Sequence, residues 1–278
     1  MANDRDIKGI LLTNYLLKKY NSPYPYYCFV TKLVSDKVKH QLSFANIKPI
    51  HIDFHNICNK FLINTEITDY LYSKFYYGKL FIFLLNSFDE CIYLDSDLLL
   101  LKNIDHLFDK LKDVDSKTMF MVPDMHQTSS NKNNESTLLI SNNQFNSGVI
   151  VFRPNQEIFS NIMQYLKTFT LDRCKQEIIT DQSVFDKLHQ TNQITIKPLQ
   201  FIYNIMPRAI QCMLDHKKIV KESDICVIHY ILSNKPWDTI YLRPYNNHLC
   251  YKYIIRWLQM YQLFVEDFLI CDKCKYTL

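Results

Sequence analysis

Apolar runs of strand length alternate with segments of helical periodicity along most of this 278-residue chain. Residues 10–20 and 69–86 repeat apolar side chains at helical spacing, and the runs between helices include YYCFV, CIYLDSD, TMFMVPD and FNSGVIVFRP. Strands that alternate with helices are typical of a mostly parallel sheet with helices on both faces. The pattern therefore predicts an α/β fold.

Two further segments complete the predicted organisation. Residues 126–144 are rich in Ser, Asn and Thr and predict a long polar loop, next to which we expect any acceptor molecule to bind. Residues 251–270 keep an apolar face at helical spacing. We interpret residues 1–240 as one α/β domain and residues 241–278 as a helical extension that packs on it.

Composition excludes several classes of protein. The net charge is only +4 and no long basic run occurs, so we expect no nucleic-acid partner. The longest apolar stretch, LFIFLL, is far shorter than the roughly 20 residues that span a bilayer, so we expect no membrane insertion. Nine cysteines behind the polar start MANDRDIKG favour reduced thiols and a cytoplasmic location. Three glycines leave no glycine-rich phosphate loop.

Two aspartates, Asp95 and Asp97, interrupt the apolar stretch CIYLDSDLLLL. Side chains at positions i and i+2 of a strand point to the same side, and open α/β sheets bind ligands at the carboxyl ends of their strands. Two carboxylates held together favour a cation between them, and oxygen ligands suit Mn²⁺ or Mg²⁺. The alternative is a solvated turn that caps the next element. A glycosidase pair is disfavoured because its carboxylates act from opposite sides of the sugar.

Other polar residues follow strands further along the chain. His229 ends the apolar run ICVIHY, and Lys235 follows in the turn NKPWD, so the two could complete a metal shell and contact an anion if the strand ends are adjacent. Asn146 and Ser147 open FNSGVIVF, and Asp181 with Gln182 begins a predicted helix. Asp181 and Gln182 could face a sugar or could cap the helix, whereas Asn146 and Ser147 could simply form a turn.

A separate hypothesis is a zinc site. Cys271 and Cys274 form a C-x-x-C pair that His248 and Cys250 could complete, although these two lack the paired spacing of known zinc modules.

Several of these motifs together resemble glycosyltransferase family 8, the glycogenin-like enzymes. KLFIFLLNSFDECIYLDSDLLLLKNIDHLF, FNSGVIVFRP, TDQ, FIYN and VIHYILSNKPW stand in the order of that family. The resemblance implies a GT-A (Rossmann-like) fold, a UDP-sugar donor, a divalent metal that is usually Mn²⁺, and transfer with retention at the anomeric carbon.

The same resemblance implies roles for individual residues. Asp95, Asp97 and His229 match metal ligands, and Lys235 matches the lysine that contacts the donor diphosphate. The positions that match donor-binding or sugar-lining residues are Asn3, Lys79, Ser96, Asn146, Ser147, Asp181 and Gln182. Asp181 and Gln182 are the candidate catalytic residues, and the sequence does not decide whether Asp181 is a nucleophile or stabilises positive charge on the sugar.

The chain departs from the family pattern at defined places. Leu232 replaces a glycine and Ile178 an aspartate, and Gln211 lies near the position of the tyrosine that glycogenin glucosylates on itself. We therefore expect a separate glycan or protein acceptor. Residues 10–31 align with the family's first helix and second strand, so the first strand is apparently truncated. The other interpretation makes ILLTN the first strand.

The leading hypothesis is a metal-dependent retaining glycosyltransferase that transfers a hexose from a UDP-sugar, with glucose as the first candidate for the hexose. The alternative is a degenerate protein that binds a nucleotide sugar with little or no transfer. A homodimer is compatible with either hypothesis.

Overall fold

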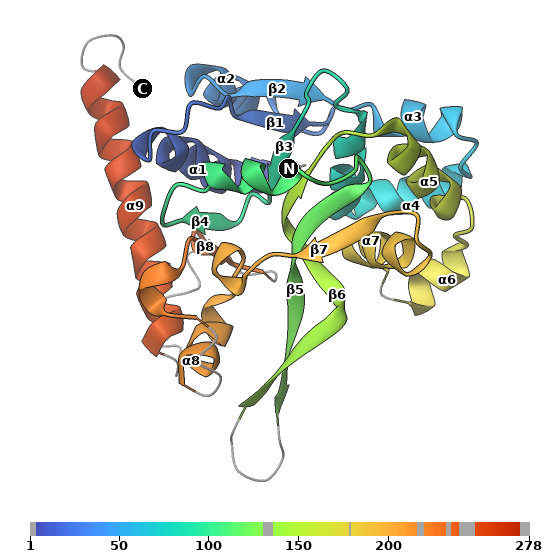
Figure 1. Cartoon of the computed structure of the whole chain (residues 1–278). Coiled ribbons are helices and arrows are strands. Elements are labelled where there is room, and N and C mark those ends of the chain that lie inside the picture. The colour runs from blue at the N-terminus through green and yellow to red at the C-terminus, as the bar shows by residue number, and fades with distance from the viewer. Residues whose placement is uncertain are drawn as a thin grey trace.

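The computed structural model describes residues 4–129, 136–177, 179–215, 220–231, 235–238 and 248–272 (Figure 1). The strands are β1 (Tyr27–Val30), β2 (Lys48–His51), β3 (Cys91–Leu94), β4 (Leu98–Leu100), β5 (Thr118–Ser129), β6 (Ser136–Phe152), β7 (Thr195–Pro198) and β8 (Val227–His229). The α-helices are α1 (Ile7–Lys19), α2 (Asp36–Phe44), α3 (Phe54–Lys60), α4 (Thr65–Ser73), α5 (Gln156–Leu166), α6 (Leu171–Gln176), α7 (Asp181–Gln190), α8 (Pro207–Asp215) and α9 (His248–Asp272). The 3-10 helices are η1 (Asp4–Asp6), η2 (Phe75–Leu84), η3 (Asp105–Leu111), η4 (Phe201–Tyr203) and η5 (Glu222–Asp224).

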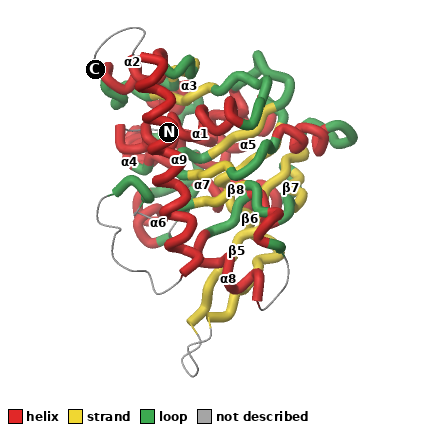
Figure 2. Tube along the Cα trace, turned by 90° about the vertical axis from the view of Figure 1, so that its left-hand side faces the viewer, coloured by secondary structure: helices red, strands yellow, loops and turns green. Residues whose placement is uncertain are grey.

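The strands form a central layer in three hydrogen-bonded groups. Strands β3, β6, β5 and β7 pair in that spatial order, while β1 pairs with β2 and β4 pairs with β8. Helices cover both faces of this layer, as Figure 1 and the turned view in Figure 2 show. The predicted α/β fold is confirmed.

Strand β6 divides the core into two apolar layers. Val149 and Val151 pack with α1, α8 and α9, whereas Ile150 and Phe152 pack with η2, α5 and α7. This alternation follows from the two-residue period of a strand. Because both faces of β6 are covered, its four residues at positions 149–152 are all apolar and buried.

Side-chain caps fix where several helices begin. The Ser35 hydroxyl accepts a hydrogen bond from the Val38 amide at the start of α2, and the Asn155 side chain caps α5. Thr180 and Ser183 form a capping box at the start of α7, so the first residue of that helix, Asp181, has a fixed position. These caps place the polar ends of the helices next to strand ends.

The sheet is mixed rather than mostly parallel, which corrects the sequence prediction. Strand β6 runs antiparallel to both of its neighbours, β3 and β5, and β4 runs antiparallel to β8; the parallel pairs are β1 with β2 and β5 with β7. Strand β6 returns directly from β5 through a hairpin, so the two must be antiparallel. Apolar composition on both faces does not indicate strand direction.

The long polar loop predicted at residues 126–144 is wrong for residues 126–129 and 136–144, while residues 130–135 lie outside the described residues. Strands β5 and β6 continue as a hairpin that pairs His126 with Leu139 and Ser129 with Ser136, and the hairpin extends away from the body (Figure 1). Ser, Asn and Thr suit an extended ribbon as well as a loop, so composition alone does not separate the two.

The helix predicted at residues 69–86 breaks near its start. Helix α4 ends at Ser73, Lys74 has φ −100° and ψ 80°, and the chain continues as the 3-10 helix η2. The aromatic residues and glycine of FYYG have low helix propensity. In addition, the Tyr77 hydroxyl donates to the Ile179 carbonyl at 2.7 Å, which anchors η2 to the segment before α7.

Helix α1 precedes the first strand that the structure describes, so the interpretation of ILLTN as a strand is wrong. Within the described ranges, β1 pairs only with β2, and β3 pairs only with β6. No described strand lies in space between β1 and β3. This agrees with the expected truncation of the first strand.

Helix α9 packs along α1 and α8 and confirms the predicted C-terminal helix (Figure 2). Trp257 of this helix is fully buried. Its ring centroid lies 5.2 Å from the ring centroid of Trp237 and 5.1 Å from that of Tyr261. Cys250 and Cys271 lie near opposite ends of this one helix, roughly 30 Å apart at 1.5 Å per residue, so they cannot bind one zinc ion and the zinc hypothesis is wrong. No helix in the described part of the chain has the length and apolar character needed to cross a membrane.

Candidate functional site

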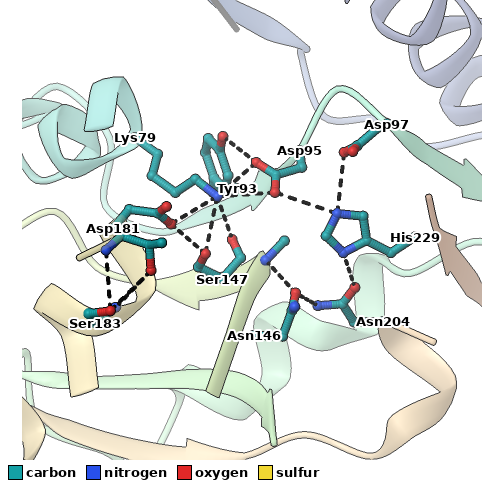
Figure 3. Close-up of polar contacts among 12 residues, drawn as sticks. Lys79, Tyr93, Asp95, Asp97, Asn146, Ser147, Asp181, Ser183, Asn204 and His229 are labelled. Atoms are coloured by element: carbon teal, nitrogen blue, oxygen red, sulfur yellow. Dashed lines mark hydrogen bonds and ion pairs between the residues drawn. The ribbon is translucent and has the colours of Figure 1, made fainter. Parts of the chain in front are cut away.

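The turn Asp95–Ser96–Asp97 joins two different groups of strands. Asp95 follows β3, and its amide donates to the Gly148 carbonyl of β6 at 2.9 Å. Asp97 precedes β4, which pairs with β8 so that Leu98 lies opposite His229. The predicted continuous strand is therefore a strand, a turn and a second strand. The turn nevertheless brings both carboxylates toward His229 (Figure 3).

The three side chains form one cluster of possible metal ligands. One atom each from Asp95, Asp97 and His229 lies within 4.8 Å of the others. His229 Nε2 is 3.3 Å from an Asp97 oxygen and 3.7 Å from an Asp95 oxygen. Two carboxylates and one imidazole match the hard, oxygen-rich donor set that Mn²⁺ and Mg²⁺ accept.

A buried hydrogen-bond chain orients the imidazole of His229. With a proton on Nδ1, this atom donates to the Asn204 amide oxygen at 2.8 Å, and Nε2 is the ring atom that faces the two carboxylates. Asn204 in turn donates to the Asn146 side-chain oxygen at 2.7 Å, and that oxygen also accepts from the Gly148 amide at 3.0 Å. Asn146 thus supports the histidine indirectly.

Two of the chain's three glycines are needed for this packing. A Cβ added to Gly148 would lie 2.5 Å from His229 Nδ1, and a Cβ added to Gly9 would overlap the Ser96 carbonyl. Glycine at these positions allows the imidazole to approach β6 and the start of α1 to approach the turn.

Lys79 of η2 lies at the other side of Asp95. Its ammonium is buried, 2.9 Å from an Asp95 oxygen, 3.1 Å from an Asp181 oxygen and 3.1 Å from the Ser147 hydroxyl (Figure 3). The Ser147 hydroxyl also lies 2.5 Å from Asp181, and the Tyr93 hydroxyl donates to Asp95 at 2.7 Å. Lys79 therefore forms ion pairs with Asp95 and Asp181, and the Ser147 hydroxyl hydrogen-bonds to Lys79 and Asp181.

The charges of the cluster set its protonation states. Burial alone would raise the pKa of Asp97, but His229 and Lys235 offset this and hold that pKa well below its usual range. Burial alone would lower the pKa of Lys79, but Asp181 and Asp95 more than compensate and raise it. Burial first, and then the Asp95 carboxylate, raises the pKa of Tyr93 well above its ordinary value. Near neutral pH, Asp97 is therefore ionised, Lys79 is protonated and Tyr93 is neutral.

Lys235 reaches the cluster from the segment after β8. Its ammonium lies 2.5 Å from an Asp97 oxygen and donates to the Tyr230 carbonyl at 2.8 Å. The Lys235 amide donates to Asp238 at 2.9 Å, and Asp238 forms an ion pair with Arg5. This links the N-terminal segment to the turn that presents the lysine.

Gln182 lies beside the cluster and is bound to a different carboxylate. The side-chain amide of Gln182 donates a hydrogen bond to the Asp124 carboxylate of β5 at 2.8 Å. One turn further along α7, the buried Asp186 accepts from the Phe145 amide at 3.1 Å, and burial raises its pKa to about 7. A second polar group therefore lies where the β5–β6 hairpin leaves the body.

The structure thus brings together most of the residues selected from the sequence. Asp95, Asp97, His229 and Lys235 meet on one side, and Lys79, Ser147 and Asp181 on the other. Ser96 lies in the turn itself. Asn3, Ile178 and Leu232 lie outside the described residues, and Gln211 lies in α8.

Sequence reasoning did not select Asn204 or Tyr93 as site residues. Asn204 belongs to the FIYN motif, which provided a signal, but its bond to His229 joins positions 25 residues apart. Tyr93 lies two residues before Asp95 in a strand, so the two-residue period would have placed both on one side.

Comparison with known proteins decides the family. The sequence profile of glycosyl transferase family 8 matches residues 8–241. The chain belongs to glycosyl transferase family 8. The family 8 chain is 25% identical to glycogenin-1 of Homo sapiens over 241 residues, which cover 86% of the chain and 61% of that protein. Glycogenin-1 of Caenorhabditis elegans is 26% identical, with 85% and 49% covered. The family 8 chain therefore spans about half to two thirds of the length of these relatives.

Other relatives extend the comparison. The uncharacterized protein R707 of Acanthamoeba polyphaga mimivirus is 25% identical, with 96% of this chain and 93% of that protein covered. Among solved structures, the bifunctional glycosyltransferase WbbM in its apo form has a TM-score of 0.59 at 17% identity, covering 94% of this chain and 50% of that one. Apo GlyE of Streptococcus pneumoniae has a TM-score of 0.54 at 19% identity, with 96% and 62% covered. These likenesses confirm a GT-A type of α/β fold for the family 8 chain.

Proposed function

We propose that this chain is a retaining glycosyltransferase that transfers a hexose from a UDP-sugar to a glycan or protein acceptor. Glucose is the first candidate for the hexose. Membership in glycosyl transferase family 8 supports the reaction class. The observation that carries the proposal is the cluster of Asp95, Asp97 and His229 with a lysine on each side. This arrangement suits a substrate whose diphosphate binds next to its sugar.

The donor set fits a divalent cation, with Mn²⁺ as the first choice and Mg²⁺ as the second. Three carboxylates (Asp95, Asp97 and Asp181) face two ammonium groups (Lys79 and Lys235), so these five groups together carry net negative charge. A bound cation would supply positive charge beside the departing diphosphate.

Lys235 and Asn204 act on the diphosphate side. Lys235 is held on Asp97 by a short contact, and a diphosphate bound there would offer this ammonium a second anionic partner. Asn204 keeps the Nδ1 proton of His229 in place, so Nε2 remains available as a ligand.

Lys79 and Asp181 act on the sugar side. Asp181 is ion-paired with Lys79 and hydrogen-bonded to Ser147, so its negative charge is already compensated. A compensated carboxylate is a weak nucleophile, and this favours a role in orienting the sugar and stabilising positive charge on it. We assign Gln182 to the same sugar, because it follows Asp181 on α7 and is fixed by Asp124.

Titration of UDP in the presence and absence of Mn²⁺ tests the metal site. We expect Mn²⁺ to strengthen UDP binding by roughly tenfold or more in the wild type. Asp97→Asn removes one ligand charge and is expected to abolish the Mn²⁺ effect, whereas Asp109→Asn, an exposed carboxylate paired with Lys112, should keep it. UDP affinity that does not respond to Mn²⁺ would contradict the proposed site.

A binding protein with little transferase activity is the second candidate. The gap between β1 and β3 favours it, because among the described residues the strand before Asp95, β3, pairs along one edge only. Mass spectrometry of UDP-hexoses incubated with the protein and Mn²⁺ separates the two: release of free hexose by water would exclude the second candidate. Binding of a UDP-hexose without release or transfer would instead exclude the first.

A further inference from the structure

Helix α9 contacts the segment that presents Lys235 at two places. The Tyr230 hydroxyl donates a hydrogen bond to the Tyr253 carbonyl of α9 at 2.6 Å. The ring centroid of Trp237 lies 5.2 Å from that of Trp257, which also belongs to α9. Tyr230 directly follows β8, and Trp237 comes two residues after the lysine. Helix α9 therefore supports the chain both before and after Lys235.

Tyr230 links α9 to the ion pair between Lys235 and Asp97. Its carbonyl accepts a hydrogen bond from the Lys235 ammonium at 2.8 Å, and its amide donates to the Asp97 carbonyl at 2.9 Å. Its side chain is buried, and the hydroxyl bond to Tyr253 is buried with it. The backbone of this residue thus bonds to both members of the ion pair, while its side chain is fixed on α9.

The contact between the two tryptophans is made by packing. Trp257 is fully buried and Trp237 is 9% exposed. Within the described residues neither indole N–H has a hydrogen-bond partner, so the rings interact through their apolar and aromatic surfaces. Trp237 also lies against Gly9 of α1. Its ring is therefore enclosed between α1 and α9.

Lys235 and Trp237 belong to one tight turn. The Asp238 amide donates to the Lys235 carbonyl at 2.9 Å, and the Lys235 amide donates to the Asp238 carboxylate at 2.9 Å. Pro236 lies between the lysine and the tryptophan, and a proline ring holds φ near about −65°. Because the turn has few free torsions, the position of the Trp237 ring also sets where the Lys235 side chain begins.

We propose that α9 positions the Lys235 ammonium for the diphosphate of a UDP-sugar. Trp257 acts as a positioning residue through Trp237. The Tyr253 carbonyl acts in the same way through Tyr230. This inference rests on the function proposed above, in which Lys235 contacts the diphosphate. The family 8 profile ends at residue 241, before the start of α9, so membership in the family does not by itself assign this role. A lysine that is fixed before the donor arrives loses less conformational entropy on binding, which strengthens the complex.

A double-variant cycle on UDP binding at constant Mn²⁺ tests the proposal in the 278-residue protein. Trp257→Leu removes the ring contact with Trp237, and we expect it to weaken UDP binding by about threefold to tenfold. Lys235→Met removes the ammonium and should weaken UDP binding by about tenfold or more. In the Lys235→Met background, Trp257→Leu should have no further effect, because the group through which it acts is absent.

Phe264→Leu is the matched control for Trp257→Leu. Phe264 is also buried in α9, about two turns further along, and its described ring contacts are with Tyr15, Tyr261 and Phe268. Each variant loses part of a buried aromatic ring, so a loss of stability alone would affect both alike. We expect both to unfold at lower urea concentration than the wild type, but only Trp257→Leu to lose UDP affinity.

Hydrogen exchange in the absence of UDP reports on the turn itself. We expect faster amide exchange at residues 235–238 in Trp257→Leu, because the turn loses its packing on α9. Phe264→Leu should exchange like the wild type in this segment.

Tyr230→Phe is the milder variant and keeps the test decisive if Trp257→Leu does not fold. It removes the hydroxyl bond to Tyr253 but keeps the Tyr230 carbonyl that accepts from Lys235. We expect it to weaken UDP binding in the wild-type background and to have no effect in the Lys235→Met background.

The outcomes separate this proposal from the function on which it rests. UDP binding by Lys235→Met at wild-type strength would contradict the diphosphate role of Lys235, and this proposal with it. Weaker binding by Lys235→Met, with an equal effect of Trp257→Leu in both backgrounds, would overturn this proposal alone. So would unchanged exchange at residues 235–238 in Trp257→Leu, or an equal loss of UDP affinity in Phe264→Leu.

Discussion

Replacing Gly148 with alanine is the sharpest test of how the candidate metal site is built. The added Cβ would lie 2.5 Å from His229 Nδ1, whereas an ordinary contact is about 3.5 Å. The imidazole must then retreat by about 1 Å, since β6 is paired on both sides and cannot move easily. That shift would stretch the 2.8 Å bond to Asn204.

The expected loss can be estimated from the ligand geometry. Metal–ligand distances tolerate about 0.2 Å, so a displacement of about 1 Å removes His229 as an effective ligand. Loss of the groups that orient a metal ligand commonly lowers affinity by roughly 10–100-fold, and we expect Gly148→Ala to weaken Mn²⁺-dependent UDP binding by that factor. Overpacking would also lower the free energy of unfolding by about 1–3 kcal/mol.

The chain contains its own matched control. A Cβ added to Gly78 meets no atom within 4 Å, so Gly78→Ala should leave Mn²⁺-dependent UDP binding unchanged and keep or slightly raise stability. Calorimetric titration of UDP at several Mn²⁺ concentrations measures the affinity, and urea denaturation measures stability. Wild-type affinity and stability in Gly148→Ala would refute the argument that this glycine makes room for the histidine.

Three further predictions test neighbouring parts of the site. Lys79→Met should lower the free energy of unfolding, measured in urea, by about 3–5 kcal/mol, because Asp95 and Asp181 lose their buried cation. The double variant Lys79→Met with Asp181→Asn should recover part of this loss. Additive losses would disprove the energetic coupling between Lys79 and Asp181. Asn204→Leu should weaken Mn²⁺-dependent UDP binding by roughly 10–100-fold through loss of His229 orientation, with metal-independent UDP binding as the internal reference. The pKa of Asp186 is raised by burial from 3.8 to about 7, so the folded state holds this proton more tightly than the unfolded state does. Wild-type stability therefore falls as the pH rises from 3.8 to about 7. Asp186→Asn should remove this part of the pH dependence in urea titrations at pH 5 and pH 8, and parallel pH profiles for the two proteins would contradict the prediction.

The sequence allowed us to predict that the site residues converge, but it did not predict their local geometry correctly. Asp95 and Asp97 were expected on one strand because i and i+2 share a face, but they meet His229 because a turn carries the chain from β3 to β4. Strand ends that follow apolar runs can be recognised from local pattern alone. A switch between two pairing partners depends on long-range hydrogen bonds, which no local pattern encodes.

Other features escaped the sequence for the same reason. The bonds from Asn204 to His229 and to Asn146 join residues on different elements, and an asparagine in FIYN has no periodic signature. The β5–β6 hairpin has the composition of a loop, and only cross-strand pairing distinguishes the two. The helix break at Lys74 combines weak local propensity with a distant anchor at Ile179.

The pairing of β4 with β8 has a consequence for how the protein folds. Lys235 contacts Asp97 across 138 positions of the chain, and His229 reaches the same carboxylate through the β4–β8 pair. Closing so long a loop costs conformational entropy before any contact compensates it, so such contacts form after local helices and hairpins. The candidate site is therefore expected among the last regions to assemble during folding, and cation-dependent UDP binding would serve as a kinetic marker of the completed native state.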